Sequence, residues 1–202
     1  MKFVLATQNP KKLKEMSAIL GELGVEVVSE ADLGVKIEVE ETGETFAENS
    51  LLKAKAVIEA TKLPAIADDS GLCVDALNGG PGVYSARFGG EGLDDIGRYR
   101  LLLQMMHGQA DRRAHFHTTI TCAFPNGDIL QNDGEVEGTI AFAPMGENGF
   151  GYDPVFLDPE LGLTAAEMSP EEKMSRSHRA KALRELLRLW PSFWEGYLRK
   201  RA

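Results

Sequence analysis

Residues 64–74 read PAIADDSGLCV, a short apolar run followed by two adjacent aspartates. The run over residues 64–67 predicts a buried strand, and residues 72–74 continue the extended pattern. Asp68 and Asp69 therefore stand where a buried strand ends, which is where α/β proteins form ligand clefts. Paired carboxylates there can hold magnesium or accept a proton from water. The Asp-Asp-Ser-Gly sequence is also typical of a plain acidic turn.

The segments before this strand alternate between strand and helix patterns. Residues 3–6 form an apolar run that predicts a strand. Asn9 and Pro10 predict the start of a helix, which Gly24 ends. Residues 25–28 predict the next strand.

Two further elements are predicted before the aspartates. The alternation of Val35, Ile37 and Val39 has the period of a strand. Thr45 and Glu48 then form a capping box for a helix of about 17 residues.

The second half of the chain predicts a long hairpin and three helical segments. The hairpin strands cover 115–124 and 129–142, with the turn sequence PNGD between them. The helical segments cover 94–106, a turn that begins at 169–170, and 177–190. Helices mixed with an antiparallel hairpin predict an α/β fold with a mixed sheet rather than a purely parallel one.

Size and charge restrict the class of protein. The chain has 202 residues, so we expect a single domain over residues 1–202. Its net charge of −9 disfavours a nucleic-acid partner, although a small polyphosphate needs only local positive charge. No signal peptide or apolar membrane span is apparent, so we expect a cytoplasmic protein without a membrane partner. Cys73 and Cys122 are interpreted as reduced core residues.

The first candidate binding segment is residues 7–12, made of Thr7, Gln8, Asn9, Pro10, Lys11 and Lys12. A strand leads through a polar turn into a helix N-terminus, where backbone N–H groups and the helix dipole favour a phosphate. Lys12 adds a full positive charge. An ordinary N-cap with surface lysines fits the same residues, and the P-loop pattern GxxxxGK[ST] is absent from them.

The second candidate segment joins the acidic pair Glu40 and Glu41 to the helix that follows them. Asn49 and Lys53 are four residues apart and share one helix face. A lysine on a face that also carries core residues indicates an anion nearby. A solvated lysine at the edge of the apolar stripe is the alternative.

Two further segments carry groups suited to a nucleotide base. In GFGYDP, residues 149–154, flanking glycines allow a ligand to approach the backbone, and Phe150 can stack on a purine. Lys173, His178 and Arg179 offer donors near a helix start, which suit either the edge of a base or a phosphate. An aromatic plug in a loop and ordinary surface charge are the simpler interpretations.

Taken in order, the motifs TxNxxK, EETG, ADDSGL, PGVYSARF, GFGYDPVF and SHRAKAL resemble the inosine triphosphate pyrophosphatase family. The likeness is closer to its bacterial branch, the XTP/dITP diphosphatases, and it extends from Thr7 to Leu183. It implies an elongated, two-lobed α/β fold with a mixed sheet, flanking helices and a central nucleotide cleft. It also implies a homodimer.

The resemblance also implies residue roles. Thr7 to Lys12, with Lys53, would bind the polyphosphate. Asp69 would be the proton acceptor and a magnesium ligand. Glu40, three residues before Gly43, would be the second ligand, with Glu41 as the alternative. The remaining substrate contacts would be Ser70, Phe150, Gly151, Tyr152, Asp153, Lys173, His178 and Arg179.

These roles predict a magnesium-dependent hydrolase that cuts dITP, ITP or XTP between the α and β phosphates. Magnesium would activate water, and Asp69 would take its proton. A pyrophosphatase for modified pyrimidine nucleotides and a nucleotide sensor without catalysis are the alternatives. The sequence does not rank the three purine substrates.

Overall fold

The computed structural model describes residues 1–200, and the chain divides into two compact units. Unit 1 contains residues 1–69, 118–134 and the chain from 179 onward. Unit 2 contains residues 70–117 and 135–178. No helix in the described part of the chain is long and apolar enough to cross a membrane.

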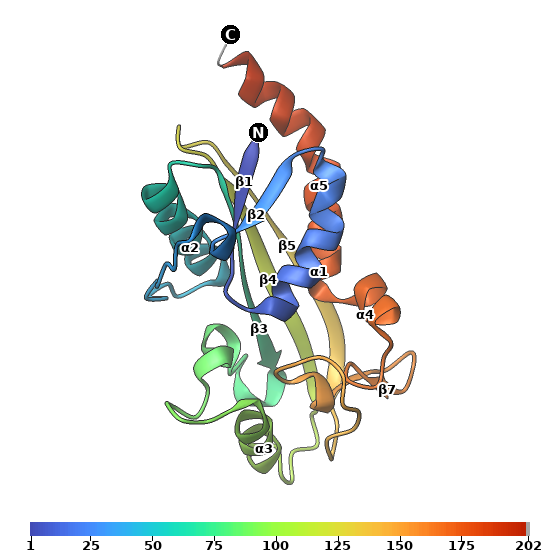
Figure 1. Cartoon of the computed structure of the whole chain (residues 1–202). Coiled ribbons are helices and arrows are strands. Elements are labelled where there is room, and N and C mark those ends of the chain that lie inside the picture. Colours follow the sequence, from blue (N-terminus) through green and yellow to red (C-terminus); the bar gives the residue numbers. More distant parts are fainter. Residues whose placement is uncertain (201–202) are drawn as a thin grey trace. The chain divides into compact units, whose positions relative to one another are not determined.

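The strands form one seven-stranded sheet in the order β2-β1-β3-β4-β5-β6-β7 (Figure 1). β1 pairs in parallel with both β2 and β3, whereas β5, β6 and β7 pair antiparallel. The bounds are β1 Lys2–Ala6, β2 Glu26–Ser29, β3 Ala65–Val74, β4 Arg113–Ala123, β5 Ile129–Ile140, β6 Phe156–Asp158 and β7 Leu163–Thr164. The predicted mixed sheet is confirmed, whereas the elongated outline and the central cleft stay predictions.

The helices begin close to the predicted positions, and all but the last end close to them. Their bounds are α1 Pro10–Leu20, α2 Phe46–Thr61, α3 Asp95–Met105, α4 Pro170–Arg176 and α5 His178–Arg199. Asn9 caps α1, and Thr45 with Glu48 forms the predicted capping box of α2. Ser169 with Glu172 forms a second capping box at α4. Local side-chain hydrogen bonds thus set these helix starts.

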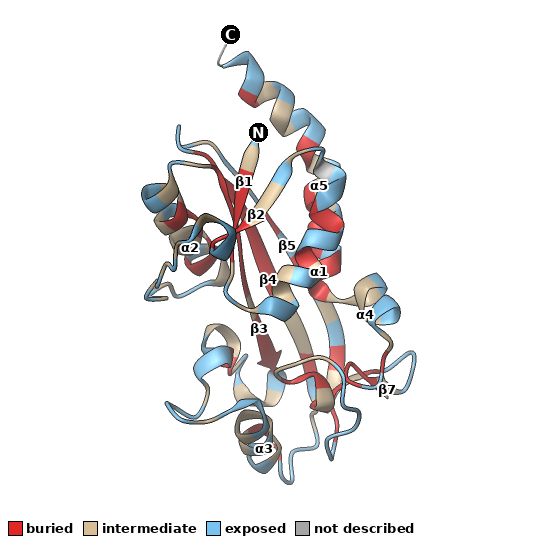
Figure 2. Ribbon diagram, viewed as in Figure 1, coloured by how far each residue is buried: buried red, intermediate tan, exposed pale blue. Residues whose placement is uncertain are grey.

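In unit 1 the strands are covered on both faces. Val4 of β1 and Ala67 of β3 pack in one cluster with Ala54 and Val57 of α2. Phe3, on the opposite face of β1, contacts the ring of Trp190 in α5 at 5.5 Å between centroids. Figure 1 accordingly shows α2 on one side of these strands and α1 and α5 on the other, and Figure 2 shows the buried residues between them. Burial on both faces explains the apolar runs in the sequence.

The core of unit 2 forms around the ends of β3, β4 and β5. Its buried members include Leu72 and Val74 of β3, Leu102 of α3, Ile140 of β5 and Phe156 of β6. Cys73 and Cys122 are both buried and free, which confirms their interpretation as core residues.

The structure corrects the predicted end of the third strand. β3 runs without interruption from Ala65 to Val74, so Asp68 and Asp69 lie inside a strand and not at its end. Both are buried, which a solvated turn would not require. The separate strand predicted over residues 35–39 does not form, and this segment has no regular structure.

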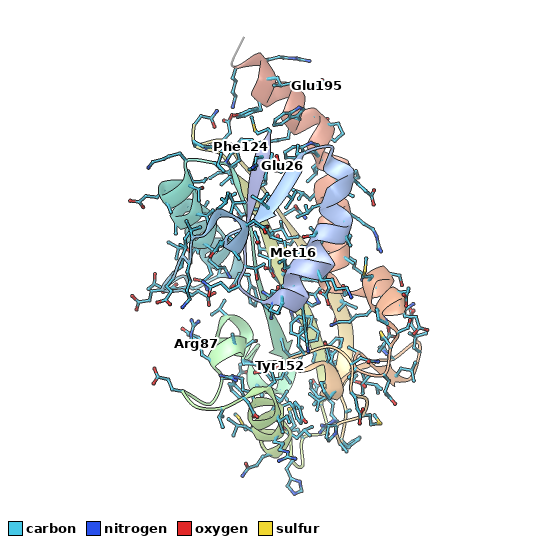
Figure 3. The ribbon with its side chains drawn as sticks, in the orientation of Figure 1. Met16, Glu26, Arg87, Phe124, Tyr152 and Glu195 are labelled. Carbon is cyan, nitrogen blue, oxygen red and sulfur yellow. The ribbon has the colours of Figure 1, made fainter. Side chains whose placement is uncertain are left out.

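The last helix is longer than predicted. α5 continues past Trp190 and through Pro191 to Arg199. Its aromatic side chains stack on one another and on Phe124, labelled in Figure 3, whose ring lies 4.4 Å from that of Tyr197. This packing offsets the hydrogen bond that a proline removes from a helix.

Candidate active site

The two adjacent aspartates of β3 point to opposite faces of the sheet. Successive side chains of a strand alternate between the faces. Ala67 packs toward α2, so Asp69 lies on that face and Asp68 on the face covered by α1 and α5. Their hydrogen-bond partners agree with this assignment, since Asp69 binds residues of α2 and Asp68 binds Lys12 and Arg179.

Asp68 is held between two cations. Its Oδ2 accepts from Lys12 Nζ at 2.8 Å and from Arg179 Nε at 3.4 Å, and its side chain is 1% exposed. Burial alone would oppose ionisation, but the charges of Lys12 and Arg179 prevail and hold the pKa of the Asp68 carboxyl well below its usual range. Asp68 is therefore a fixed negative charge that holds two cationic side chains in place.

Arg179 also binds an acid that sequence reasoning missed. Its Nη1 donates to Glu15 Oε2 at 2.5 Å, and its side chain is 3% exposed. Glu15 lies three residues after Lys12 on α1, a spacing that brings helix side chains together and that could have indicated it. Arg179 was predicted to contact the nucleotide. The structure places it in unit 1, where it shares the Asp68 carboxylate with Lys12.

Asp69 is held by two residues of α2. Lys53 Nζ donates to its Oδ1 at 2.7 Å, and Asn49 Nδ2 donates to its Oδ2 at 3.4 Å. Burial raises the pKa of the Asp69 carboxyl above its ordinary value, and the charge of Lys53 only partly offsets this effect. A raised pKa makes a carboxylate a stronger proton acceptor, so Asp69 is suited to act as a general base.

Glu40 and Glu41 also differ in their surroundings. Glu41 Oε1 accepts from Lys53 Nζ at 3.0 Å, so Glu41 and Asp69 share one ammonium group. Glu40 is exposed, and no ion pair of Glu40 is found among residues 1–200. Two carboxylates that share one cation are also placed to share a magnesium ion, and their hard oxygen atoms suit it. This geometry favours Glu41 over Glu40, although no group of three metal-ligating side chains occurs in the described chain.

The six residues of the 7–12 segment lie together, but their backbone donors are partly used. Asn9 Oδ1 accepts from the N–H groups of Lys11 and Lys12 at 2.9 and 3.3 Å, and Asn9 N donates to Thr7 Oγ1. Gln8 Nε2 donates to the carbonyl of Ile37. An anion here would therefore depend on the Lys12 charge more than on open helix N–H groups.

Unit 2 contains a small pocket that is half open to solvent. It is lined by Phe116, Val136, Asp153, Phe156, Asp158, Ala165, Met168, Lys173, Arg176, Ser177 and His178. The ring of His178 stacks on Phe116 at 4.8 Å, and Phe116 contacts Phe156 at 4.6 Å. The pocket thus combines an apolar lining with charged and polar groups, as sites for planar heterocycles do.

The glycine-rich loop and Lys173 form one cluster. Asp153 Oδ2 accepts from Phe150 N at 2.8 Å and from Lys173 Nζ at 2.7 Å. Lys173 Nζ also lies 4.6 Å from the centroid of the Phe150 ring. A side chain at Gly149 would begin 2.0 Å from Asp153 Oδ2, so only glycine permits this packing.

Three other predicted contacts differ in their surroundings. Tyr152 is buried, and its hydroxyl donates to the carbonyl of Ser85, so its ring belongs to the core of unit 2. Gly151 N donates to Asp95 Oδ2 of α3 at 2.8 Å, an anchor that the sequence did not indicate. Ser70 follows Asp69 in β3 and is partly exposed.

Comparison with known proteins assigns this arrangement to a family. The model of the Ham1 family matches residues 3–189. A relative from Nitratidesulfovibrio vulgaris named dITP/XTP pyrophosphatase is 49% identical over 201 residues, covering 96% of this chain and 97% of the relative. A Thermus thermophilus protein of the same name is 52% identical over 188 residues, covering 93% and 90%.

Solved structures agree. A HAM1 protein from Coxiella burnetii has a TM-score of 0.88 and 41% identity, covering 95% of this chain and 99% of that one. The Staphylococcus aureus Ham1 protein has a TM-score of 0.84 and 41% identity, covering 98% and 100%. The resemblance predicted from the motif series is thereby confirmed, and the chain belongs to the Ham1 family.

Proposed function

We propose that this chain hydrolyses non-standard purine nucleoside triphosphates, namely dITP, ITP and XTP, to the monophosphate and pyrophosphate. The observation that carries the proposal is the geometry around the neighbours Asp68 and Asp69. Asp68 binds Lys12 and Arg179 on one face of β3, and on the other face the buried carboxylate of Asp69 shares the ammonium group of Lys53 with Glu41. Relatives that match over almost the whole chain and are named dITP/XTP pyrophosphatase support it.

In the proposed reaction Asp69 takes a proton from the water that attacks phosphorus, and the bond to the leaving pyrophosphate breaks. The ammonium groups of Lys12 and Lys53 stabilise the charge that develops on the leaving group. Asp68 keeps Lys12 in place and does not take part in proton transfer, because its lowered pKa makes the carboxylate a weak proton acceptor.

Magnesium dependence is part of the proposal. When bound, the ion would lower the pKa of water and neutralise phosphate charge. Asp69 would hold it with a carboxylate of the 40–41 pair, and the shared ammonium of Lys53 supports Glu41, with Glu40 as the alternative. We also propose a homodimeric assembly, which the resemblance supports, and a cytoplasmic location, which the sequence supports because no signal peptide or apolar membrane span is apparent in it.

The base would be recognised by the residues of unit 2. Phe150 offers a ring face, and Lys173 and His178 offer donors beside the apolar lining of the pocket. Hypoxanthine and xanthine carry an oxygen acceptor at position 6, where adenine carries an amino group. A donor that meets an amino group leaves both polar groups without a partner, which disfavours adenine.

A substrate panel tests this function. We expect dITP and XTP to release pyrophosphate with magnesium, and kcat/KM for dITP to exceed that for dATP by about 10²-fold or more. Pyrophosphate and orthophosphate are assayed separately. Orthophosphate alone would indicate a different phosphohydrolase, preference for modified pyrimidines would indicate the related enzyme class, and tight binding without turnover would indicate a sensor.

Exchanging each aspartate for asparagine should separate their roles. Asp69→Asn should lose turnover by several powers of ten, because it removes both the base and a metal ligand. Asp68→Asn should instead destabilise the fold by about 3–5 kcal/mol, because Lys12 and Arg179 lose their shared buried counter-charge. Urea unfolding and pyrophosphate release are measured for both variants. Activity of Asp69→Asn within threefold of wild type would place the base elsewhere, and equal stability of the two variants would refute the role of Asp68.

The metal ligand can be identified by comparing Glu41→Gln with Glu40→Gln. We expect Glu41→Gln to raise the magnesium concentration for half-maximal activity by about tenfold or more, because it removes an oxygen ligand beside Asp69. Glu40→Gln serves as the matched control and should change the half-saturating magnesium concentration less than threefold. A larger effect of Glu40→Gln than of Glu41→Gln would assign the ligand to Glu40.

A further inference from the structure

Lys53 and Asn49, one turn apart on α2, each connect β3 to the loop that precedes the helix. Lys53 Nζ bonds to Asp69 Oδ1 in β3 and to Glu41 Oε1 in the loop before the helix. Asn49 Nδ2 bonds to Asp69 Oδ2, and Asn49 Oδ1 accepts from Gly43 N at 2.8 Å. Both oxygens of Asp69 are thus held from one helix face, and the loop is held at two points. Lys53 supplies a charged connection and Asn49 a neutral one.

The orientation of the Asn49 amide is fixed by its partners. The side chain is fully buried, and the Gly43 N–H can only be met by the carbonyl oxygen. The amino group must then face Asp69. The backbone N–H of Asn49 donates to the carbonyl oxygen of Thr45 at the start of α2. Asn49 therefore contacts both the helix start and the loop.

Gly43 is required by the closeness of this contact. A side chain there would begin 2.6 Å from Asn49 Oδ1 and 2.7 Å from Glu48 Cβ. Such distances are shorter than real contacts of this kind, so any other residue would push the loop and the amide apart. The close packing at Gly43 thus holds the loop against Asn49, and the Asn49 amide connects that loop to Asp69.

We propose that Asn49 is a positioning residue that sets the spacing between Asp69 and the carboxylate-bearing loop at 40–43, and so the geometry of the metal site. This inference rests on the proposed function and concerns a residue to which that proposal gives no role. A neutral amide suits the task, because it orients a carboxylate without competing with a metal ion for it. Residues that orient metal ligands typically change metal affinity or activity 10- to 100-fold when removed.

Three variants test the inference. Asn49→Ala removes both connections. Asn49→Asp keeps an acceptor for Gly43 N but cannot donate to Asp69, so it removes one connection only. Ser50→Ala is the matched control, because Ser50 is the next residue of α2, is equally buried, and loses a hydrogen bond to Thr121 that lies outside the proposed spacing contacts. Circular dichroism establishes which variants are folded.

Metal binding is measured without substrate, by titrating each protein with Mn²⁺ and following the free ion by electron paramagnetic resonance. Magnesium-dependent pyrophosphate release from dITP is measured in parallel. We expect Asn49→Ala to raise the Mn²⁺ dissociation constant and the half-saturating Mg²⁺ concentration about tenfold. We expect Asn49→Asp to bind Mn²⁺ at least as tightly as wild type but to lose about tenfold in kcat, because it adds a charge and misorients Asp69. Ser50→Ala should match wild type in both assays.

The opposite result is equally definite. A merely structural role predicts that all three variants melt earlier and keep the Mn²⁺ affinity and kcat of wild type within twofold, which overturns the inference. If Asn49→Ala does not fold, normal kcat in Asn49→Asp overturns it alone. If wild type neither binds Mn²⁺ nor releases pyrophosphate from dITP, the proposed function fails as well. If wild type does both and the variants match it, only this inference fails.

Discussion

The alternation of side chains along β3 places two adjacent carboxylates on opposite faces of one buried strand. A buried carboxylate is costly unless it has a charged or hydrogen-bonded partner, so each face must supply one. α1 and α5 supply Lys12 and Arg179 to Asp68, and α2 supplies Lys53 and Asn49 to Asp69. The positions of three helices in unit 1 are therefore tied to two consecutive residues.

The alternation along β3 also gives Asp68 and Asp69 different surroundings. Asp68 is surrounded by cations and stays ionised, so its contribution is to hold Lys12 and Arg179. Asp69 is buried against α2 with a raised pKa, and its partners leave it suited to accept a proton. We therefore propose different roles for these two residues of identical type, because the strand turns them toward different surroundings. The loop at 40–43 is joined to Asp69 through α2, which connects the start of that helix to the proposed metal site.

Local signals in the sequence predicted what local interactions determine. The caps at Asn9, Thr45 and Ser169 and the hairpin turn after Phe124 were all found in the structure, because each depends on residues at most four apart. The continuation of β3 through its polar centre could not be predicted this way. It depends on counter-charges from α1, α2 and α5, which are remote in sequence. The passage of α5 through Pro191 likewise depends on aromatic packing against Phe124, a tertiary contact.

The residues of the site were likewise predicted in part. The motif series identified Lys53 and Asp69, which bond to each other, and Lys12, which bonds to the neighbouring Asp68 on the other face of β3. It did not include Glu15, although the three-residue spacing from Lys12 places both on one side of α1, and Arg179 reaches Glu15 from the far end of the chain. Tyr152 was predicted to contact substrate, and the structure adds that its ring is buried in the core of unit 2, which sequence spacing alone does not indicate.

The division between the two aspartates can be measured directly by carbon-13 NMR of the aspartate carboxyl groups during a pH titration. The two signals are assigned with the asparagine variants. The account predicts that Asp69 titrates above the ordinary aspartate value of about 3.9. It also predicts that Asp68 stays ionised down to the pH at which the protein unfolds. Two aspartates that titrate together, or Asp68 titrating above Asp69, would contradict the claim that β3 places them in opposite electrostatic surroundings.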